Sequence, residues 1–248
     1  MRQSVLDLRA FYASPLGGVA RAMVSRKIVE AWGDAAGLDV LALGYATPYL
    51  YAMEPAARSV VAAMPAAQGV EAWPFSGANR VCLADEAALP LGNSMFERVL
   101  AVHALEESDD PGAVLEEICR VMSPSGRVIL AVAARHGLWA SSEKSPFGQG
   151  RPFSRVQLER LVRDAELTAV GWTRALYAPP VAWAARWAEP FEQVGARLWP
   201  PFAGIVLMEA VKQTWAVNPI PTARRVRART RARPVMAPAP VGGRAILD

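Results

Sequence analysis

Five short apolar runs constrain what this chain can fold into more than any other feature. They lie at 38–43 (LDVLAL), 58–63 (RSVVAA), 80–84 (RVCLA), 98–102 (RVLAV) and 127–133 (RVILAVA). Nearly continuous apolar sequence of this length is typical of strands that are covered on both faces. Because helical or loop segments separate the runs, we predict an α/β fold built on a doubly wound, mostly parallel sheet with helices on both faces.

The segments between and after these runs complete the predicted fold. Helices are expected at about 14–32, 111–122, 154–165 and 181–198, and further strands near 168–174 and 203–211. Ser14-Pro15 and Asp110-Pro111 are good helix starts, because each pairs a capping side chain with a proline at the first helical position. "SPSG" at 123–126 predicts a turn, and the Gly/Pro/Ser-rich loop 137–153 a mobile lid.

The charge is unevenly distributed along the 248 residues. Residues 222–248 carry seven arginines and one aspartate, whereas the preceding residues have a small net negative charge. We therefore predict one domain over 1–217 and a disordered Arg/Ala/Pro-rich tail over 218–248. The scarcity of lysine beside abundant alanine and proline indicates a GC-rich bacterial genome.

Several classes of protein are disfavoured by composition. The longest charge-free apolar stretches are far shorter than the roughly 20 residues of a membrane-spanning helix, and the N-terminus lacks the apolar run of a signal peptide. The two cysteines, Cys82 and Cys119, are too few and too far apart for a zinc site or a disulfide framework. We expect a cytoplasmic protein without a bound metal.

Ligands of open parallel sheets bind beyond the carboxyl ends of the strands. That rule selects segments 44–47, 62–65, 85–86, 103–106 and 135–136, and both histidines of the chain, His103 and His136, fall in this set.

The succession "VLALGYATPYL", "VVAAMP", "CLADEAALPLGNSMFERVLAVHALEES" and "LEEICRVMSPSGRVILAVAAR" resembles the small-molecule branch of the class I S-adenosylmethionine-dependent methyltransferases. The resemblance covers about residues 38–135. It implies a seven-stranded, Rossmann-like sheet whose reversed final strand lies inside the edge, and 203–211 is the candidate for that strand. It also implies S-adenosylmethionine as the cofactor.

The resemblance further implies roles for individual positions. Gly44 matches the first glycine of the cofactor loop, which continues through Tyr45, Ala46 and Thr47. Asp85 matches the residue that accepts a hydrogen bond from the adenine amino group, and Glu86 would present its backbone N–H to the ring. His103 matches the rim where the methyl group meets its acceptor.

Other positions depart from the family pattern. Ala42 and Ala62 stand where acidic residues are usual, and Ala46 and Pro48 replace the second and third glycines. Thr47 as a cap and Pro48 at the first helical position predict a clean helix "PYLYAME" after the turn. The dinucleotide fingerprint is absent, which disfavours a nicotinamide enzyme.

Two functions remain open from the sequence. The first is methyl transfer from S-adenosylmethionine to a small, partly apolar molecule. The alternative is a non-catalytic methyltransferase-like protein, for binding or scaffolding, that has lost strong cofactor binding; Ala42 and Ala62 motivate it. His103 is either a general base or a cavity-lining hydrogen-bond partner.

Two further segments also have two interpretations each. The aromatic stripe of 181–198 either packs on the fold or forms a wall for an apolar acceptor or a partner surface. The arginine-rich tail either binds nucleic acid or an acidic membrane surface, or is a solvated extension.

Overall fold

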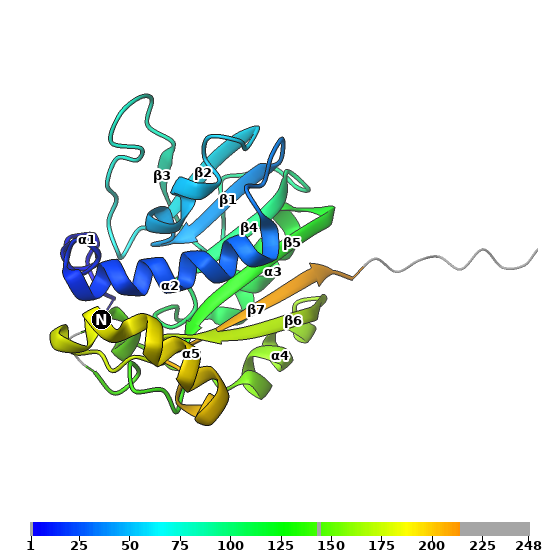
Figure 1. The fold of residues 1–248 in the computed structure, drawn as a ribbon. Helices are drawn as coiled ribbons and strands as arrows, with labels where there is room; N and C mark the ends of the chain where they lie inside the picture. Colours follow the sequence, from blue (N-terminus) through cyan, green and yellow to red (C-terminus); the bar gives the residue numbers. More distant parts are fainter. Residues whose placement is uncertain (1, 143–144, 214–248) are drawn as a thin grey trace, which may run out of the picture. The chain divides into compact units, whose positions relative to one another are not determined.

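Seven strands form one sheet in the computed structural model, which describes residues 2–142 and 145–213 (Figure 1). The strands are β1 (Asp39–Gly44), β2 (Ser59–Pro65), β3 (Val81–Ala84), β4 (Phe96–Val102), β5 (Met122–Ala133), β6 (Leu167–Ala175) and β7 (Ile205–Lys212). Their order is β3-β2-β1-β4-β5-β7-β6, and only β7 runs antiparallel to its neighbours. The predicted mostly parallel, seven-stranded sheet and its reversed strand inside the edge are both confirmed.

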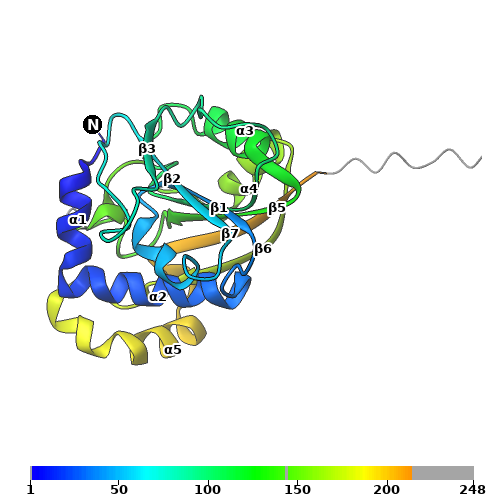
Figure 2. The same ribbon diagram turned by 90° about the horizontal axis from the view of Figure 1, so that it is seen from above.

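Helices cover both faces of this sheet, as predicted. They are α1 (Val5–Ala13), α2 (Pro15–Trp32), α3 (Pro111–Val121), α4 (Arg155–Asp164) and α5 (Ala188–Leu198), with the 3-10 helices η1 (Thr47–Ala52), η2 (Pro146–Gly148), η3 (Ala182–Trp187) and η4 (Pro200–Phe202). Figure 2 shows α2 on one face and α3 with α4 on the other. Two apolar clusters, one under each helical layer, form the core.

Local chemistry explains where most of these helices begin. Asp110 accepts hydrogen bonds from two backbone N–H groups of the first turn of α3, and Ser154 forms a capping box with Gln157 at the start of α4. Ser14 caps α2 with Pro15 at its first position, as predicted.

The helix α1 is an element that the sequence analysis missed. The signal for it was present: Ser4 caps the helix by accepting from the N–H of Asp7, and Val5, Leu8 and Tyr12 follow at helical spacing. All three side chains are buried. The helix therefore belongs to the core rather than to a loose N-terminus.

Three details of the predicted segments are wrong. "SPSG" forms no separate turn, because β5 begins at Met122 and includes these four residues as a bulge opposite β4, where the register passes from Phe96 with Met122 to Arg98 with Arg127. The predicted helix over 181–198 is not one helix but η3 followed by α5. Pro190 lies in the first turn of α5, where its missing N–H removes no helical hydrogen bond.

The third correction concerns the segment after β1. Thr47 is the first residue of η1 rather than its cap; Ala46 precedes it, without a side-chain hydrogen bond to the helix. The predicted helix "PYLYAME" is thus a short 3-10 helix, which spans Thr47–Ala52.

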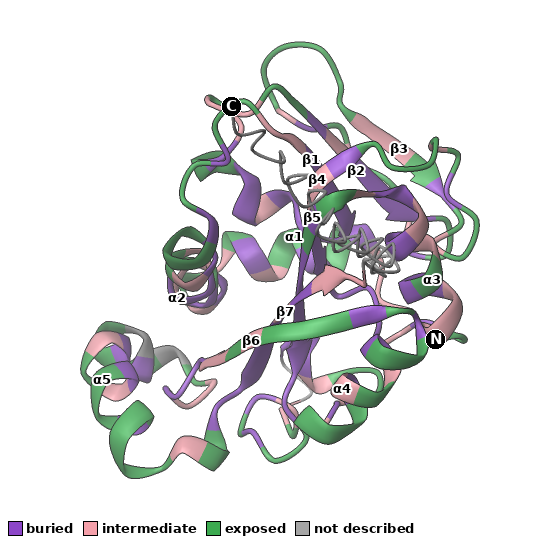
Figure 3. Cartoon of the chain, turned by 90° about the vertical axis from the view of Figure 1, so that its right-hand side faces the viewer, coloured by how far each residue is buried: buried purple, intermediate pink, exposed green. Residues whose placement is uncertain are grey.

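Burial differs sharply between the middle and the edge of the sheet. Figure 3 shows the central strands buried and much of β6, the edge strand, exposed. No helix in the described part of the chain is long and apolar enough to cross a membrane. The described residues fall within one compact unit, and the predicted tail 218–248, with the domain boundary near 217, lies outside them.

Candidate functional site

The first strand-end loop turns at Gly44. Its φ is +79°, and a Cβ there would lie 2.2 Å from the carbonyl oxygen of Val102 at the end of β4. Tyr45 N–H donates to that same oxygen at 2.8 Å. Glycine is therefore required, since both the backbone conformation and the close approach of β4 exclude a side chain.

The strand register revises the position inferred for a ribose-binding acid. Ala62 pairs with Ala42 in the middle of the two strands, and both side chains are buried. β2 continues to Pro65, so the residues at its carboxyl end are Met64 and Pro65, not Ala62. Neither is acidic, so no carboxylate ends β2.

Asp85 and Glu86 follow β3 and border a cavity of about 780 Å³, within the usual size range of small-molecule sites. Asp85 is exposed, and its Oδ1 accepts from the N–H of Ala87 at 2.9 Å. The N-terminal residue Arg2 and the loops that follow β2, β3, β4 and β5 supply the cavity lining, which comprises Arg2, Ala66, Ala67, Asp85, Glu86, Ala87, Glu106, Glu107, Ser108, Asp109, Asp110, Gly150 and Arg151.

This cavity is strongly acidic. Six carboxylates face two arginines across it. Glu106 is the most buried of them: its Oε1 accepts from the N–H of Ala133 at 3.0 Å, while its Oε2 has no partner in the described part of the chain. Burial raises the pKa of Glu106 to about 7. Among the described residues, no group of three His, Cys, Asp or Glu side chains is arranged to hold a metal ion.

Residues 2–4, here called the N-terminal arm, cross the same edge of the sheet. The guanidinium of Arg2 forms an ion pair with Glu86 and donates to the carbonyl oxygen of Ala104 at 3.2 Å. The N–H of Gln3 donates to the carboxylate of Glu107 at 2.8 Å. The Arg2 side chain is only 6% exposed, so the arm links the loops after β3 and β4 and covers the gap between them.

His103 lies beneath α1 in a buried aromatic cluster. Its Nε2 is 2.8 Å from the hydroxyl of Tyr12, which is 2.7 Å from the hydroxyl of Tyr49. Burial, reinforced by the charge of Arg2, lowers the pKa of His103 to about 3, so the imidazole is neutral. Its φ of +53° lies in the left-handed region, a strained conformation that is common at functional sites.

The cofactor loop predicted from the sequence lies beneath the same helix. The rings of Tyr45 and Tyr12 stack with centroids 5.6 Å apart, and Ala46 and Thr47 are buried. The hydroxyl of Tyr45 donates to Glu71 at 2.6 Å. The predicted residues thus form two groups: Asp85 and Glu86 border the open cavity, whereas His103 and residues 44–47 are covered by α1.

The described residues of the predicted lid, loop 137–153, include two aromatic side chains that pack into this region. Trp139 and Phe147 are buried, and the ring centroid of Phe147 lies 4.7 Å from that of His103. Trp139 donates to the carbonyl of Ala178 at 2.7 Å. A lid motion stays a prediction. His136, by contrast, is exposed at the start of the loop.

Sequence reasoning missed the groups that close the site. Arg2 and Tyr12 come from a segment that gave no chemical motif, and Glu71 comes from a loop without regular structure. The capping pattern that predicts α1 could have revealed Tyr12 as an inward-facing residue. Nothing local indicated where Arg2 or Glu71 would lie.

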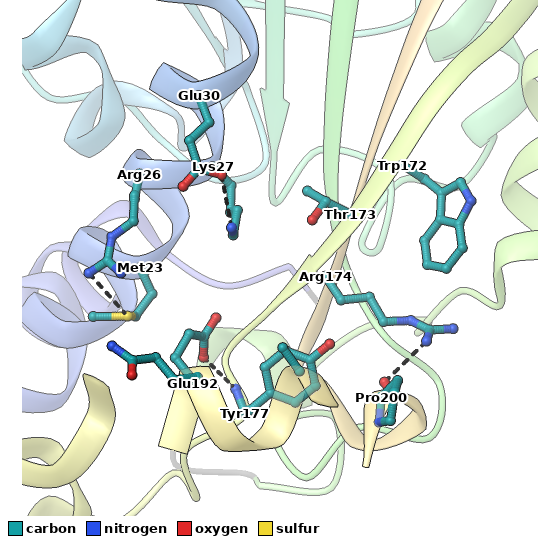
Figure 4. Close-up of a pocket in the computed structure, with 12 residues that line it drawn as sticks. Met23, Arg26, Lys27, Glu30, Trp172, Thr173, Arg174, Tyr177, Glu192 and Pro200 are labelled. Atoms are coloured by element: carbon teal, nitrogen blue, oxygen red, sulfur yellow. Dashed lines mark hydrogen bonds and ion pairs between the residues drawn. The ribbon is translucent and has the colours of Figure 1, made fainter. Parts of the chain in front are cut away.

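A second cavity, of about 460 Å³, lies between α2 and β6 (Figure 4). Lys27 pairs with Glu30 at 2.8 Å, and Glu192 accepts from the N–H of Tyr177 at 2.9 Å. Arg174 donates to a backbone carbonyl. None of the residues predicted to bind the cofactor or to act in catalysis lines this cavity, so the acidic cavity at the strand ends is the candidate site.

One family model and several solved structures are similar to this chain. The family model described as a methyltransferase domain matches residues 33–130, which run from the end of α2 into β5. The chain is similar in structure to the 1,6-didemethyltoxoflavin-N1-methyltransferase of Burkholderia thailandensis, with 20% identity, 81% of this chain and 79% of that one covered, and a TM-score of 0.51. That structure contains 1,6-didemethyltoxoflavin and S-adenosylhomocysteine.

A second similar structure is an S-adenosylmethionine-dependent methyltransferase from Mesorhizobium loti, with 13% identity, 75% and 96% of the two chains covered, and a TM-score of 0.54. A comparison with curated proteins finds no match in sequence. At these identities the structural likeness shows the fold, and the family model is similar to residues 33–130 of the chain.

Proposed function

We propose, on the premise that this chain belongs to the class I S-adenosylmethionine-dependent methyltransferases, that it transfers a methyl group from S-adenosylmethionine to a small, partly apolar molecule. The observation that carries the proposal is the cavity of about 780 Å³ at the carboxyl ends of the strands, bordered by Asp85 and Glu86. This is the edge at which sheets of this kind bind ligands.

The chemistry of the cavity lining fits the adenosine half of the cofactor. Asp85 is exposed and uses only one carboxylate oxygen in its turn, so its other oxygen is available to an amino group. The backbone N–H of Glu86 is the partner inferred for the ring. The bound cofactor would supply a sulfonium methyl group as the electrophile.

Binding of the methionine half of S-adenosylmethionine would require the residues that cover the loop after β1 to move away. Gly44, Tyr45, Ala46 and Thr47 are the proposed contacts, yet the ring of Tyr12 stacks on Tyr45. The N-terminal arm also lies across this route, because Arg2 binds Ala104, whose Cβ is 3.1 Å from the Cβ position of Gly44. We infer that α1 and the arm move when the cofactor enters.

His103 is proposed to border the methyl acceptor. In the closed arrangement it is a weak proton acceptor, because burial lowers its pKa to about 3. Its role there is to hold the hydroxyl of Tyr12. Exposure to water on opening would raise the pKa of His103 toward its ordinary value, at which it can accept a proton from the acceptor.

Calorimetry with S-adenosylmethionine and S-adenosylhomocysteine tests the proposal directly. We expect binding by the full-length chain and weaker binding by Asp85→Ala. Asp34→Ala is the matched control, because Asp34 also accepts from the N–H two residues on, at 3.1 Å, far from the cavity in the chain. Absence of binding at millimolar ligand would favour the non-catalytic alternative, and equal affinities of the two variants would refute the role of Asp85.

A further inference from the structure

The helix α5 presents its apolar side to solvent. Val194 and Leu198 of α5 are 43% and 70% exposed, and Trp187, which directly precedes the helix, is 53% exposed on the same helical spacing. The opposite side, with Ala188, Glu192 and Gly195, is buried. A surface helix normally buries its apolar stripe, so this arrangement is inverted.

Contacts on the inner side prevent α5 from turning its apolar stripe inward. Gly195 packs so closely on Tyr177 that a Cβ at this position would lie 2.5 Å from the Tyr177 Cβ. Both carboxylate oxygens of Glu192 accept backbone N–H groups, from Leu176 at 3.1 Å and Tyr177 at 2.9 Å. Rotation would leave these buried groups without partners.

The exposed apolar surface extends beyond α5 itself. It forms what we call the tryptophan patch, which comprises Trp183, Trp187, Phe191, Val194, Leu198, Trp199 and Phe202. A groove of about 420 Å³ runs through it, lined almost wholly by apolar atoms. Contiguous apolar surface of this kind marks a site of interaction with a partner or a membrane. In Figure 2, α5 lies outside α2, on the side of α2 that faces away from the sheet.

The charges around the tryptophan patch are positive. Arg186 and Arg197 are exposed, whereas Glu192 is buried and Glu189 is held by Arg26 in an ion pair at 2.5 Å. Outside the described residues, the sequence carries seven further arginines in 222–248. Exposed aromatic side chains flanked by arginine are the combination that suits an interface between anionic lipid headgroups and acyl chains.

We propose that the tryptophan patch docks this protein on an anionic lipid bilayer. The aromatic side chains enter the headgroup region, and Arg186 and Arg197 contact lipid phosphates. A bilayer suits this surface better than a second copy of the chain, because a two-fold interface would bring the same arginines against each other. Apolar insertion combined with a basic segment supplies the two signals that stable membrane attachment requires. The proposal does not depend on methyl transfer.

Vesicle co-sedimentation of the full-length chain tests this proposal. We expect binding to vesicles of equal parts phosphatidylcholine and phosphatidylglycerol, and much weaker binding to phosphatidylcholine alone. Trp183→Ser with Leu198→Ser should weaken the partition coefficient on the anionic vesicles about tenfold or more, because two large apolar groups no longer leave water. The matched control is Phe75→Ser with Val156→Ser, which removes two side chains of similar exposure (77% and 66%) outside the patch and should bind as the parent does.

A second variant keeps the test decisive if the serine pair does not fold. Arg186→Glu with Arg197→Glu changes exposed positions only and should reduce the preference for anionic vesicles, while the arginines of residues 222–248 retain part of it. The proposal fails if the parent chain binds neither vesicle, or if patch and control variants bind equally while deletion of 222–248 abolishes binding. It also fails if the serine pair dissolves a dimer seen by analytical ultracentrifugation and the parent does not bind vesicles.

Discussion

Replacing Arg2 by alanine should tighten cofactor binding rather than weaken it. In the folded chain the Arg2 guanidinium contacts both Glu86 and Ala104, and the two charged side chains are only 6% and 13% exposed. A hydrogen bond to a charged group contributes about 1.5–3 kcal/mol. If the N-terminal arm must leave before the cofactor enters, the free energy needed to break the Arg2 contacts reduces the apparent affinity for the cofactor.

The expected magnitude follows from that cost. Each 1.4 kcal/mol corresponds to a tenfold change in affinity, so Arg2→Ala should lower the dissociation constant for S-adenosylhomocysteine by roughly 10- to 100-fold. Glu86→Gln should give a similar gain in affinity, because it removes the charge that pairs with Arg2. The glutamine keeps the backbone N–H inferred for the adenine ring. The double variant should gain little more than either single change, since both break the same contact.

Isothermal titration calorimetry on the full-length variants measures these constants. Arg21→Ala is the matched control, because it removes an equal charge from an exposed position of α2 and should leave affinity unchanged. Weaker binding by Arg2→Ala would show that Arg2 holds the cofactor instead of excluding it, and the opening step would then have to be abandoned.

Three further predictions concern the interior of the site. Gly44→Ala should destabilise the fold by more than about 2 kcal/mol in urea unfolding, through backbone strain and a clash with β4, whereas Gly18→Ala, with open space around it in α2, should not. Tyr12→Phe should lower the free energy of unfolding by about 1–3 kcal/mol for each buried partner left without a hydrogen bond. An unchanged midpoint of urea unfolding would contradict the hydrogen bonds assigned to the Tyr12 hydroxyl. Glu106 has a folded pKa of about 7 above an ordinary value of 4.5, so the folded state binds the proton more tightly and stability falls as pH rises between these values, by up to about 3 kcal/mol. Glu106→Gln should flatten that slope, and an identical slope in both proteins would place the titration elsewhere.

The sequence by itself determined the order of the seven strands and the starts of α2, α3 and α4. Apolar runs about half a dozen residues long indicate strands, although only the structure shows that the run in β3 forms a half-exposed edge strand. Asp110 with Pro111 fixes a helix start because capping depends on neighbouring residues alone. Gly44 follows from the same local logic, although only the structure shows the carbonyl of Val102 that excludes any other residue.

Tertiary structure alone decided what covers the site. Arg2 reaches Glu86 across 84 positions of the chain, and Tyr12 reaches His103 across 91. No local pattern encodes such contacts, because they depend on how α1 packs over the ends of the strands. The outward-facing stripe of α5 is of the same kind. Its helical spacing is visible in the sequence, but which side faces solvent depends on the fit of Gly195 against Tyr177, and that fit exists only in the folded chain.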